Sequence, residues 1–483
     1  MRIGDQAAIL TLSRLASFGL MLLGPLLLVR LVPIEEFGRY REFVLYASLL
    51  QGLATFAIPD SLLYFIPAHP RSPWRVVRLN LLLTAACSLV VVAGLIAADL
   101  VSGGVLVGPY LVPLVIYTLL MVNFDFWEAL LIALRRPRDV MIYTAARLAS
   151  RMLVAVGAAA LTRSVAVIIW SLVVLEGVRF VIAAFVWRSM DRSASEPPVE
   201  DGWRSHLRFC LPTGLSMLLA MARRNVATLA VVKMLGPIPL AQFSIGKYGE
   251  PIIATVRNSL SSVILPEMVR REEGGANQSL ALWKHATAIC ALVLFPIVPV
   301  VVRYAEPLVE TLFGEAYLGA AIVMQLYMLV VVRECFDFSP ALRARARTAP
   351  LVYGTLAGLI VAGAVVYPLV TRAGIAGAMA SFIIGSYVEA IWLAATVMAL
   401  YGIGVREMLP WSSLGKTVVA SALASLLLVT PWWTDILGFA GIVVASACYA
   451  AVYVLLIWRL RIPESEVLFG WVARFARRAQ RSQ

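Results

Sequence analysis

Long apolar runs alternate with short polar breaks along the chain from Ile9 to Trp458. The hydrocarbon core of a bilayer is about 30 Å thick and takes about 20 apolar residues per helix. The runs reach this length repeatedly, and they are too long and too uniformly apolar for barrel strands. The pattern therefore predicts an all-α, polytopic transmembrane helix bundle of about 14 spans. The predicted spans are 9–32, 42–67, 79–98, 109–134, 143–162, 165–187, 208–235, 240–265, 283–302, 319–340, 349–371, 374–401, 415–433 and 438–459.

The longest polar break lies at 188–207 and is rich in serine, proline and acidic residues. Such a composition is typical of a flexible linker, here cytoplasmic, with little packing. The break leaves six predicted spans before it and eight after it. The expected parts are an N-terminal lobe at 1–187, a C-terminal lobe at 208–401, an extra pair of spans at 402–459 and a basic tail at 460–483. The tail suits either an interfacial amphipathic helix on anionic lipid or a disordered basic segment.

The two lobes resemble each other weakly at their starts. LVRLVPIEEFGRY (28–40) can be aligned with VVKMLGPIPLAQF (231–243), and the next helix ends in YFIP in one lobe and VILP in the other. Six spans per repeat would give both repeats one orientation, related by an axis along the membrane normal. Chance similarity between apolar segments is the alternative.

Arginine is concentrated in the loops that follow even-numbered spans, for example Arg135, Arg136 and Arg138. Because cytoplasmic loops of membrane proteins are rich in Lys and Arg, both termini are expected in the cytoplasm, with the chain crossing the cell's inner (cytoplasmic) membrane many times. The chain holds 41 Lys and Arg against 28 Asp and Glu, a net charge of +13. The loop bias accounts for this excess better than nucleic-acid binding does, so no nucleic-acid partner is expected.

The five cysteines all lie in apolar runs and form no Cys-x-x-Cys, and the three histidines are far apart. We therefore expect no disulfide framework, no metal site and no cofactor. The sequence also lacks a G-x-S-x-G, an H-E-x-x-H and a P-loop, and it has no long external loop. These absences favour a transporter over an enzyme.

Charged residues within the predicted spans need a partner, a cavity or water, because a charge at the bilayer centre costs about 2.5–3.5 kcal/mol or more. Glu176 and Arg179 are three residues apart, and Arg333 and Asp337 are four apart. Both spacings allow the two charges to neutralise each other on one helix face.

Arg147 and Arg151 carry like charges four residues apart. They repel each other unless an anion or acidic neighbours lie between them. Asp125 and Glu128 in the preceding span are natural partners, so an interhelical cluster and an anion site both remain open.

Arg223 and Arg224 lie near the middle of the seventh predicted span, and their own helix supplies no acid. We expect them to form a cationic site in a water-filled cavity, because guanidinium groups suit phosphate and carboxylate. The candidate cavity cations are Arg14, Arg223, Arg224, Lys247 and Arg257. The candidate coupling or cavity acids are Asp60, Asp125, Glu128 and Glu250. Glu250 can act as a protonatable switch or pair locally with Lys247.

Helix-breaking residues occur in the same spans, notably Pro59, Gly246, Gly249 and Pro251. Bends at these places would help helices to rock around a central site. The alternative is that membrane helices simply tolerate glycine and proline.

Several segments resemble a known family. They are LVRLVPIEEFGRYREF, FCLPTGLSMLLAMARRN, VKMLGPIPLAQFSIGKYGEP, LVETLFGEAYLGAAIVMQ and GIAGAMASFIIGSYVEA. In this order they are similar to segments of the oligosaccharide flippases of the polysaccharide-biosynthesis family. That family belongs to the multidrug/oligosaccharidyl-lipid/polysaccharide superfamily.

The resemblance implies two six-helix lobes around a central cavity, alternating access, and a polyprenyl-pyrophosphate-linked oligosaccharide as cargo for surface polysaccharide such as exopolysaccharide. It implies glycosyltransferases and a polymerase as partners. The sequence departs from many relatives at 223–225, where Arg-Arg-Asn replaces an acidic residue, which puts ion coupling there in doubt. The alternatives are a multidrug or toxin antiporter of the superfamily, a membrane-embedded glycosyltransferase or ligase, and a non-transporting scaffold.

Overall fold

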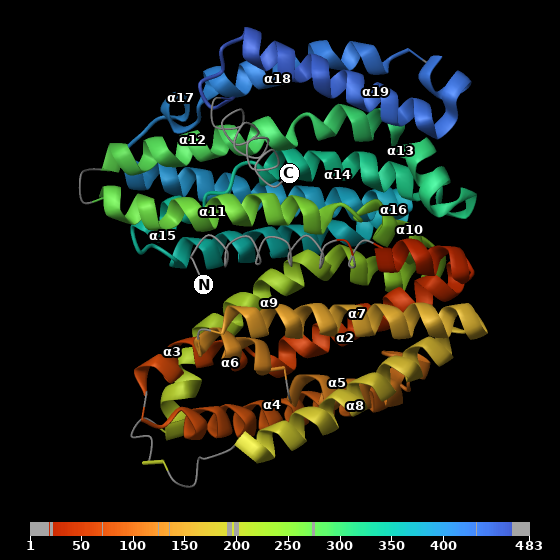
Figure 1. The fold of residues 1–483 in the computed structure, drawn as a ribbon, viewed down its shortest axis with the longest axis vertical. Coiled ribbons are helices and arrows are strands. Elements are labelled where there is room, and N and C mark those ends of the chain that lie inside the picture. The colour runs from red at the N-terminus through yellow and green to blue at the C-terminus, as the bar shows by residue number, and fades with distance from the viewer. Residues whose placement is uncertain are drawn as a thin grey trace, which may run out of the picture. The chain divides into compact units, whose positions relative to one another are not determined.

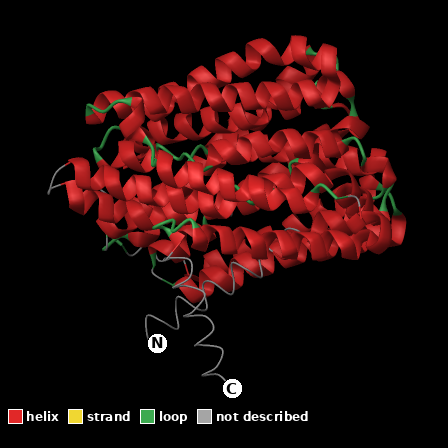
Figure 2. Cartoon of the chain, turned by 90° about the horizontal axis from the view of Figure 1, so that it is seen from above, coloured by secondary structure: helices red, strands yellow, loops and turns green. Residues whose placement is uncertain are grey.

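The computed structural model describes residues 19, 23–69, 71–123, 125–134, 136–190, 196–197, 202–272, 276–430 and 432–465 (Figure 1). Within these ranges all regular secondary structure is helical, and Figure 2 shows no strand there. The all-α fold class is therefore confirmed.

The helices of the first half follow residues 23–31, which are also helical. They are α2 (Ile34–Thr55), α3 (Leu62–Ala68), α4 (Pro73–Val101), α5 (Leu111–Asn123), α6 (Trp127–Ala133), α7 (Pro137–Thr162), α8 (Val165–Met190) and α9 (Gly202–Leu235). Short 3₁₀ turns at Pro59–Ser61 and Gly108–Tyr110 precede α3 and α5.

The second half continues with shorter helices and one very long one. They are α10 (Pro237–Gly246), α11 (Glu250–Glu272), α12 (Ala276–Leu294), α13 (Ile297–Phe313), α14 (Ala320–Glu334), α15 (Ser339–Ala344), α16 (Ala349–Tyr401), α17 (Val405–Met408), α18 (Trp411–Ser425) and α19 (Trp432–Arg459). Further 3₁₀ turns lie at Glu315–Tyr317 and Leu426–Leu428.

From the second span onward, every predicted span falls on one of these helices or on a consecutive pair of them. In the described part of the chain, nine helical stretches are long and apolar enough to cross a membrane, or ten if a bent pair counts as one. The longest, Ala349–Tyr401, holds two predicted spans. They meet at Ala373 and Gly374, where the backbone leaves the helical region and Gly374 takes a φ of 55° that favours glycine.

Two of the expected bends are present. The stretch from α2 to α3 bends by 47°, and α10 ends at Gly246 before α11 begins at Glu250. At the first bend Phe56 and Ala57 adopt φ values of 44° and 57°, which is uncommon for residues other than glycine. Pro212 is another proline of a predicted span, and α9 continues through it.

The chain forms two compact units. Unit 1 comprises 1–222 and 236–241, and unit 2 comprises 223–235 and 242–483. The first 21 residues of α9 thus belong to unit 1, and its remainder from Arg223 to Leu235 belongs to unit 2.

Aromatic side chains form part of the core of unit 1. The ring of Phe43 on α2 lies 5.5 Å from that of Tyr117 on α5 and 6.3 Å from that of Tyr110. Leu62 and Phe126 are also fully or almost fully buried. These apolar contacts hold the helices around the bend together.

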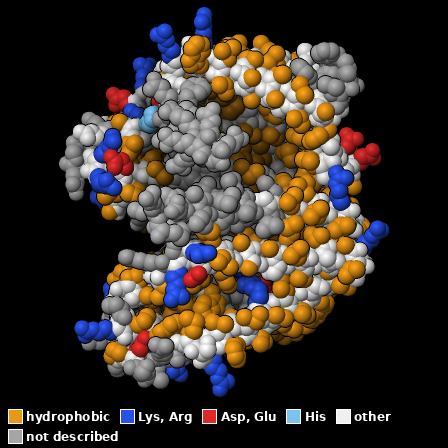
Figure 3. All heavy atoms as spheres, viewed as in Figure 1, with side chains coloured by type: hydrophobic (Ala, Val, Ile, Leu, Met, Phe, Trp, Pro, Cys, Tyr) orange, Lys and Arg blue, Asp and Glu red, His pale blue; other side chains and the backbone are white. Residues whose placement is uncertain are grey.

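In unit 2, α18 and α19 lie side by side next to α12 and α13 (Figure 1). Tyr453 of α19 donates a hydrogen bond to the carbonyl of Leu292 at 2.9 Å. The hydroxyl oxygens of Tyr449 and Ser421 are also hydrogen-bonded, at 2.9 Å. The last two helices therefore share a core with the rest of unit 2. Hydrophobic side chains cover most of the described surface seen in Figure 3, as expected of a protein embedded in lipid.

The polar break before α9 is anchored within unit 1. Glu196 accepts hydrogen bonds from the backbone N–H groups of Arg75 at 2.8 Å and Trp74 at 3.3 Å, at the start of α4. Ser72 donates to the carbonyl of Pro197 at 2.9 Å. The expectation of little packing is therefore wrong at these residues, because a linker carboxylate satisfies N–H groups that have no partner within α4.

We predict that Glu196→Ala lowers the free energy of unfolding by about 0.5–2 kcal/mol, the usual contribution of a helix cap. Thermal unfolding of the purified protein in detergent would measure the change. Glu310→Ala is a suitable control, because Glu310 is exposed and has no side-chain partner among the described residues. Equal unfolding temperatures for both variants would contradict the prediction.

Candidate functional site

Arg223 and Arg224 are adjacent on α9 but have different surroundings. Neighbouring side chains on a helix point about 100° apart. The side chain of Arg223 is 13% exposed, whereas Arg224 is exposed and has no hydrogen-bond or ion-pair partner among the described residues.

The partner of Arg223 is Glu389 on the second half of α16. Nη2 of Arg223 lies 3.1 Å from Oε2 of Glu389, and the carboxylate is 9% exposed. Arg223 is therefore paired. Its own helix supplies no acid, but a helix far along the sequence does.

The Glu389 carboxylate is held from three sides. Nη2 of Arg333 on α14 lies 3.0 Å from Oε2, and the hydroxyl of Thr355 on the first half of α16 donates to Oε1 at 2.8 Å. A buried carboxylate is tolerated when charge partners and hydrogen bonds replace its water. Glu389 has such partners on both oxygens.

The network continues from Arg333 to Glu334 and Arg257. Nη1 of Arg333 lies 3.0 Å from Oε1 of Glu334, and the other oxygen of Glu334 is hydrogen-bonded by Arg257 of α11. Arg333 also donates to the carbonyl of Ser386 at 3.3 Å. The side chain of Arg333 is 8% exposed.

Arg333 does not pair with Asp337, so that prediction is wrong. Helix α14 ends at Glu334, and Asp337 therefore lies beyond the helical turn that an i,i+4 pair requires. Asp337 instead accepts hydrogen bonds from the hydroxyl of Ser261 at 2.6 Å and the backbone N–H of Ser339 at 3.0 Å.

The network carries a surplus of positive charge. It contains three guanidinium groups, those of Arg223, Arg257 and Arg333, and two carboxylates, those of Glu334 and Glu389. Arg224 adds an exposed cation on the same helix as Arg223. Nε of Arg223 is buried without a hydrogen-bond partner among the described residues. Such an arrangement suits an anion better than a cation.

Two glycines let the halves of α16 approach each other beside Arg223. A Cβ on Gly358 would come within 2.6 Å of the carbonyl oxygen of Gly385 and 3.2 Å of Cδ of Arg223. A Cβ on Gly385 would lie 2.7 Å from the carbonyl oxygen of Gly358. Small residues thus make the space in which Arg223 reaches Glu389.

Lys247 and Glu250 pair locally at the break between α10 and α11. Nζ of Lys247 lies 3.1 Å from Oε2 of Glu250 and 4.5 Å from the ring centre of Phe382 on α16. The lysine is therefore held by both a carboxylate and an aromatic face. Its side chain is 12% exposed, and that of Glu250 is 35% exposed.

In unit 1, Asp125 in the turn between α5 and α6 pairs with Arg147 of α7, which agrees with the cluster alternative. Nη1 of Arg147 lies 2.6 Å from Oδ1 of Asp125, and the amide of Gln51 donates to Oδ2 at 2.8 Å. Glu128 makes no ion pair in the part of the chain that the structure describes. The cluster therefore involves one of the two expected acids.

The predicted pair of Glu176 and Arg179 is confirmed by a hydrogen bond between their side chains. Arg151 lies 4.0 Å from the other oxygen of Glu176 and donates to the hydroxyl of Tyr117. Glu176 and Arg179 line a pocket of about 270 Å³ between α5, α6, α7 and α8.

Asp60 and Arg14 are the two remaining candidates. Asp60 is exposed in the turn that follows the bend after α2. Arg14 lies outside the described residues.

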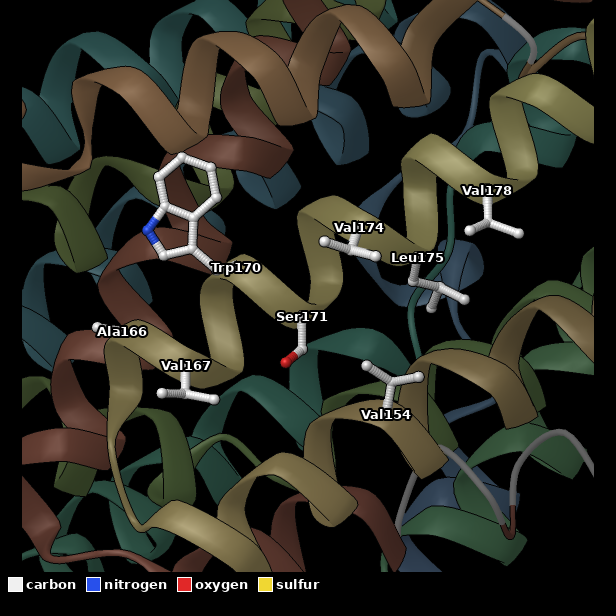
Figure 4. A pocket seen from close by; sticks show the side chains of 8 residues that line it. All are labelled: Val154, Ala166, Val167, Trp170, Ser171, Val174, Leu175 and Val178. Atoms are coloured by element: carbon white, nitrogen blue, oxygen red, sulfur yellow. The ribbon is translucent and has the colours of Figure 1, made fainter.

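A second pocket of unit 1 is an apolar groove of about 590 Å³ between α7 and α8 (Figure 4). It is lined by Val154, Ala166, Val167, Trp170, Ser171, Val174, Leu175 and Val178. No charged side chain lines it, so it has no group that would bind an anion.

A family model described as polysaccharide biosynthesis protein matches residues 27–322, well over half of the chain. The chain belongs to this polysaccharide biosynthesis family. No curated protein matches its sequence significantly.

Solved structures share the fold of this family member. A lipid II flippase, MurJ, in an inward closed conformation gives a TM-score of 0.70 at 12% identity, over 94% of this chain and 99% of that chain. An inward-facing multidrug resistance MATE family transporter of the MOP superfamily gives 0.60 at 15% identity, over 79% and 95%. A MOP superfamily transporter from Pyrococcus furiosus gives a TM-score of 0.50 at 15% sequence identity, over 82% of this chain and 95% of that chain. The fold is thus that of membrane flippases and transporters.

Glu389 was missed among the charged residues of the predicted spans. It is the only acidic residue between Ala349 and Tyr401. A single acid in so long an apolar stretch must find a partner in another helix, and that signal could have identified it. The identity of the partner could not follow from spacing, since Arg223 and Arg333 both lie on other helices.

We predict that Gly358→Ala destabilises this polysaccharide biosynthesis family member by about 1–3 kcal/mol, because overpacking forces the halves of α16 apart. Gly363→Ala in the same half of α16 is the control, because a Cβ there meets nothing within 4 Å. Unfolding temperature and membrane abundance would be compared. Equal behaviour of both variants would show that the approach of Gly358 to Gly385 is not needed.

Proposed function

We propose that the protein is a flippase that moves a polyprenyl-pyrophosphate-linked oligosaccharide across the cytoplasmic membrane by alternating access, for the synthesis of a surface polysaccharide. The observation that carries the proposal is the cationic network around Arg223 in a protein of this family and fold. Arg223 and Arg224, with Lys247 and Arg257, hold the pyrophosphate, while the lipid tail stays in the bilayer.

Charge balance supports an anionic cargo. The network has one more guanidinium group than carboxylates, and Arg224 lies beside it without a partner among the described residues. Guanidinium groups bind phosphate oxygens through two parallel hydrogen bonds, which adds orientation to charge. Glycosyltransferases and a polymerase would supply and consume such a cargo.

A multidrug or toxin antiporter is the second candidate, favoured by the likeness to the MATE family transporter. An exporter of cationic compounds needs acids that are free to meet its cargo. In the network around Arg223, the two acids, Glu334 and Glu389, are both engaged by arginines. The surplus charge therefore favours the flippase.

The central prediction concerns the double variant Arg223→Gln, Arg224→Gln. Charge-assisted hydrogen bonds contribute about 1.5–3 kcal/mol each, so losing two should weaken cargo binding by about two to four decades. Surface-polysaccharide output should fall while membrane abundance stays near that of the unchanged protein. Arg223→Lys, which keeps the charge and loses the fork, should be less damaging than Arg223→Gln.

The control is Arg270→Gln, Arg271→Gln, which removes two adjacent arginines that pair with exposed Glu267 at the end of α11. Export should be unaffected in this control. If the Arg223, Arg224 double variant exports surface polysaccharide fully at normal membrane abundance, the proposal is wrong. Equal losses of abundance and export would leave the two arginines a structural role only.

The orientation is a further part of the proposal, with both termini in the cytoplasm. Alkaline phosphatase fused after Met190, at the end of α8, and at Gln483 should be inactive, and fluorescent protein fused at the same places should fluoresce. An active phosphatase at either place would overturn this orientation.

A further inference from the structure

An acid beside an anion-binding arginine can act in two opposite ways. As a charge it repels the anion, so its removal should tighten binding. As a support it fixes the arginine in the geometry that the anion needs, so its removal should weaken binding. Glu389 contacts Arg223 directly, and the two roles predict changes of opposite sign.

We propose that Glu389 is a positioning residue for the anion site, and that it holds the guanidinium of Arg223 ready for the phosphate of the cargo. This inference rests on the function proposed above. In this role Glu389 on α16 orients the guanidinium group of Arg223 on α9.

The carboxylate of Glu389 is rigid enough for this role. Thr355 fixes Oε1 at 2.8 Å and Arg333 fixes Oε2 at 3.0 Å, and these two partners come from different helical segments. The close approach of Gly358 and Gly385 fixes the distance between the halves of α16 that carry Thr355 and Glu389. A carboxylate held in this way defines one position for a further donor.

Arg223 keeps donors for a second partner. Its contact with Glu389 is made through Nη2, whereas Nε is buried and has no hydrogen-bond partner among the described residues. A guanidinium group carries five N–H donors in a planar fork, so it can bridge a carboxylate on one side and a phosphate on another. Glu389 therefore need not leave when the cargo arrives.

The charge of Glu389 also keeps two cations together. Arg223 and Arg333 approach the same oxygen, Oε2, at 3.1 and 3.0 Å. If Glu389 were neutral, the two guanidinium groups would repel each other in surroundings of low dielectric constant. Arg223 has a long, flexible side chain and would be the one to move, because Arg333 retains Glu334 and the carbonyl of Ser386.

The test is binding of inorganic pyrophosphate to the purified full-length protein by isothermal titration calorimetry. Glu389→Gln keeps the shape of the side chain and removes its charge. We expect affinity to fall by about one to two decades, the equivalent of one charge-assisted hydrogen bond. Thr355→Val, which changes no charge, should weaken binding in the same direction and by less.

Two comparisons separate positioning from a general loss of structure. In an Arg223→Gln background, Glu389→Gln should cause no further loss, because the residue acts through Arg223. Glu267→Gln is the charge control, since it removes an exposed acid outside the predicted spans, where hydrogen bonding by Arg271 lowers the pKa of the carboxyl. Affinity should not change in this control.

Tighter or unchanged pyrophosphate binding by Glu389→Gln would overturn the positioning role. If that variant does not fold, unchanged affinity in Thr355→Val would overturn it as well. Failure of Arg223→Gln to weaken binding would instead remove the anion site and with it the proposed function. If Arg223→Gln binds pyrophosphate more weakly and Glu389→Gln binds it more tightly, the anion site stands. Only the positioning role of Glu389 is then refuted.

Discussion

A charged side chain within a bilayer must be given a partner by the protein, and this requirement organises both units. Each unit places a buried glutamate on a long apolar helix, Glu176 on α8 and Glu389 on α16. Each glutamate contacts two arginines. Thr355 in the first half of α16 donates a hydrogen bond to Glu389, and the hydroxyl of Tyr143 on α7 accepts one from Arg179. The helices that carry the charges are therefore fixed by ionic contacts as well as by apolar packing.

The two units differ in what lies beside their ion pairs. In unit 1, Asp125 and Arg147 form a closed pair, with Gln51 on the second carboxylate oxygen. In unit 2, arginines outnumber carboxylates in the network, and Arg224 lies exposed beside it. Arginines outnumber carboxylates in unit 1 as well, where Arg151 and Arg179 share Glu176. The exposed Arg224, which has no partner among the described residues, is therefore the feature of unit 2 that suits a role in binding.

The sequence predicted the helices well because bilayer thickness imposes one length on every apolar run. It also predicted the contacts that local spacing determines, such as that of Glu176 with Arg179. It failed where the contact joins helices distant in the chain, as between Arg223 and Glu389, and where a helix ends early, as before Asp337. It also failed at Glu196, because a linker composition cannot reveal that one carboxylate caps α4. The bends near Pro59 and Gly249 were predictable from residue type, although their angles were not.

The separation of Arg223 from its partner has a consequence for biosynthesis. Glu389 follows Arg223 by 166 residues, so the ribosome completes α9 long before it makes the second half of α16. At about 5–20 residues per second, the arginine waits roughly 10–30 s for its carboxylate. During that interval Arg223 cannot reach Glu389, so water or lipid phosphate must meet its charge. Synonymous codons that slow translation between α9 and α16 would lengthen the time that Arg223 spends without its carboxylate.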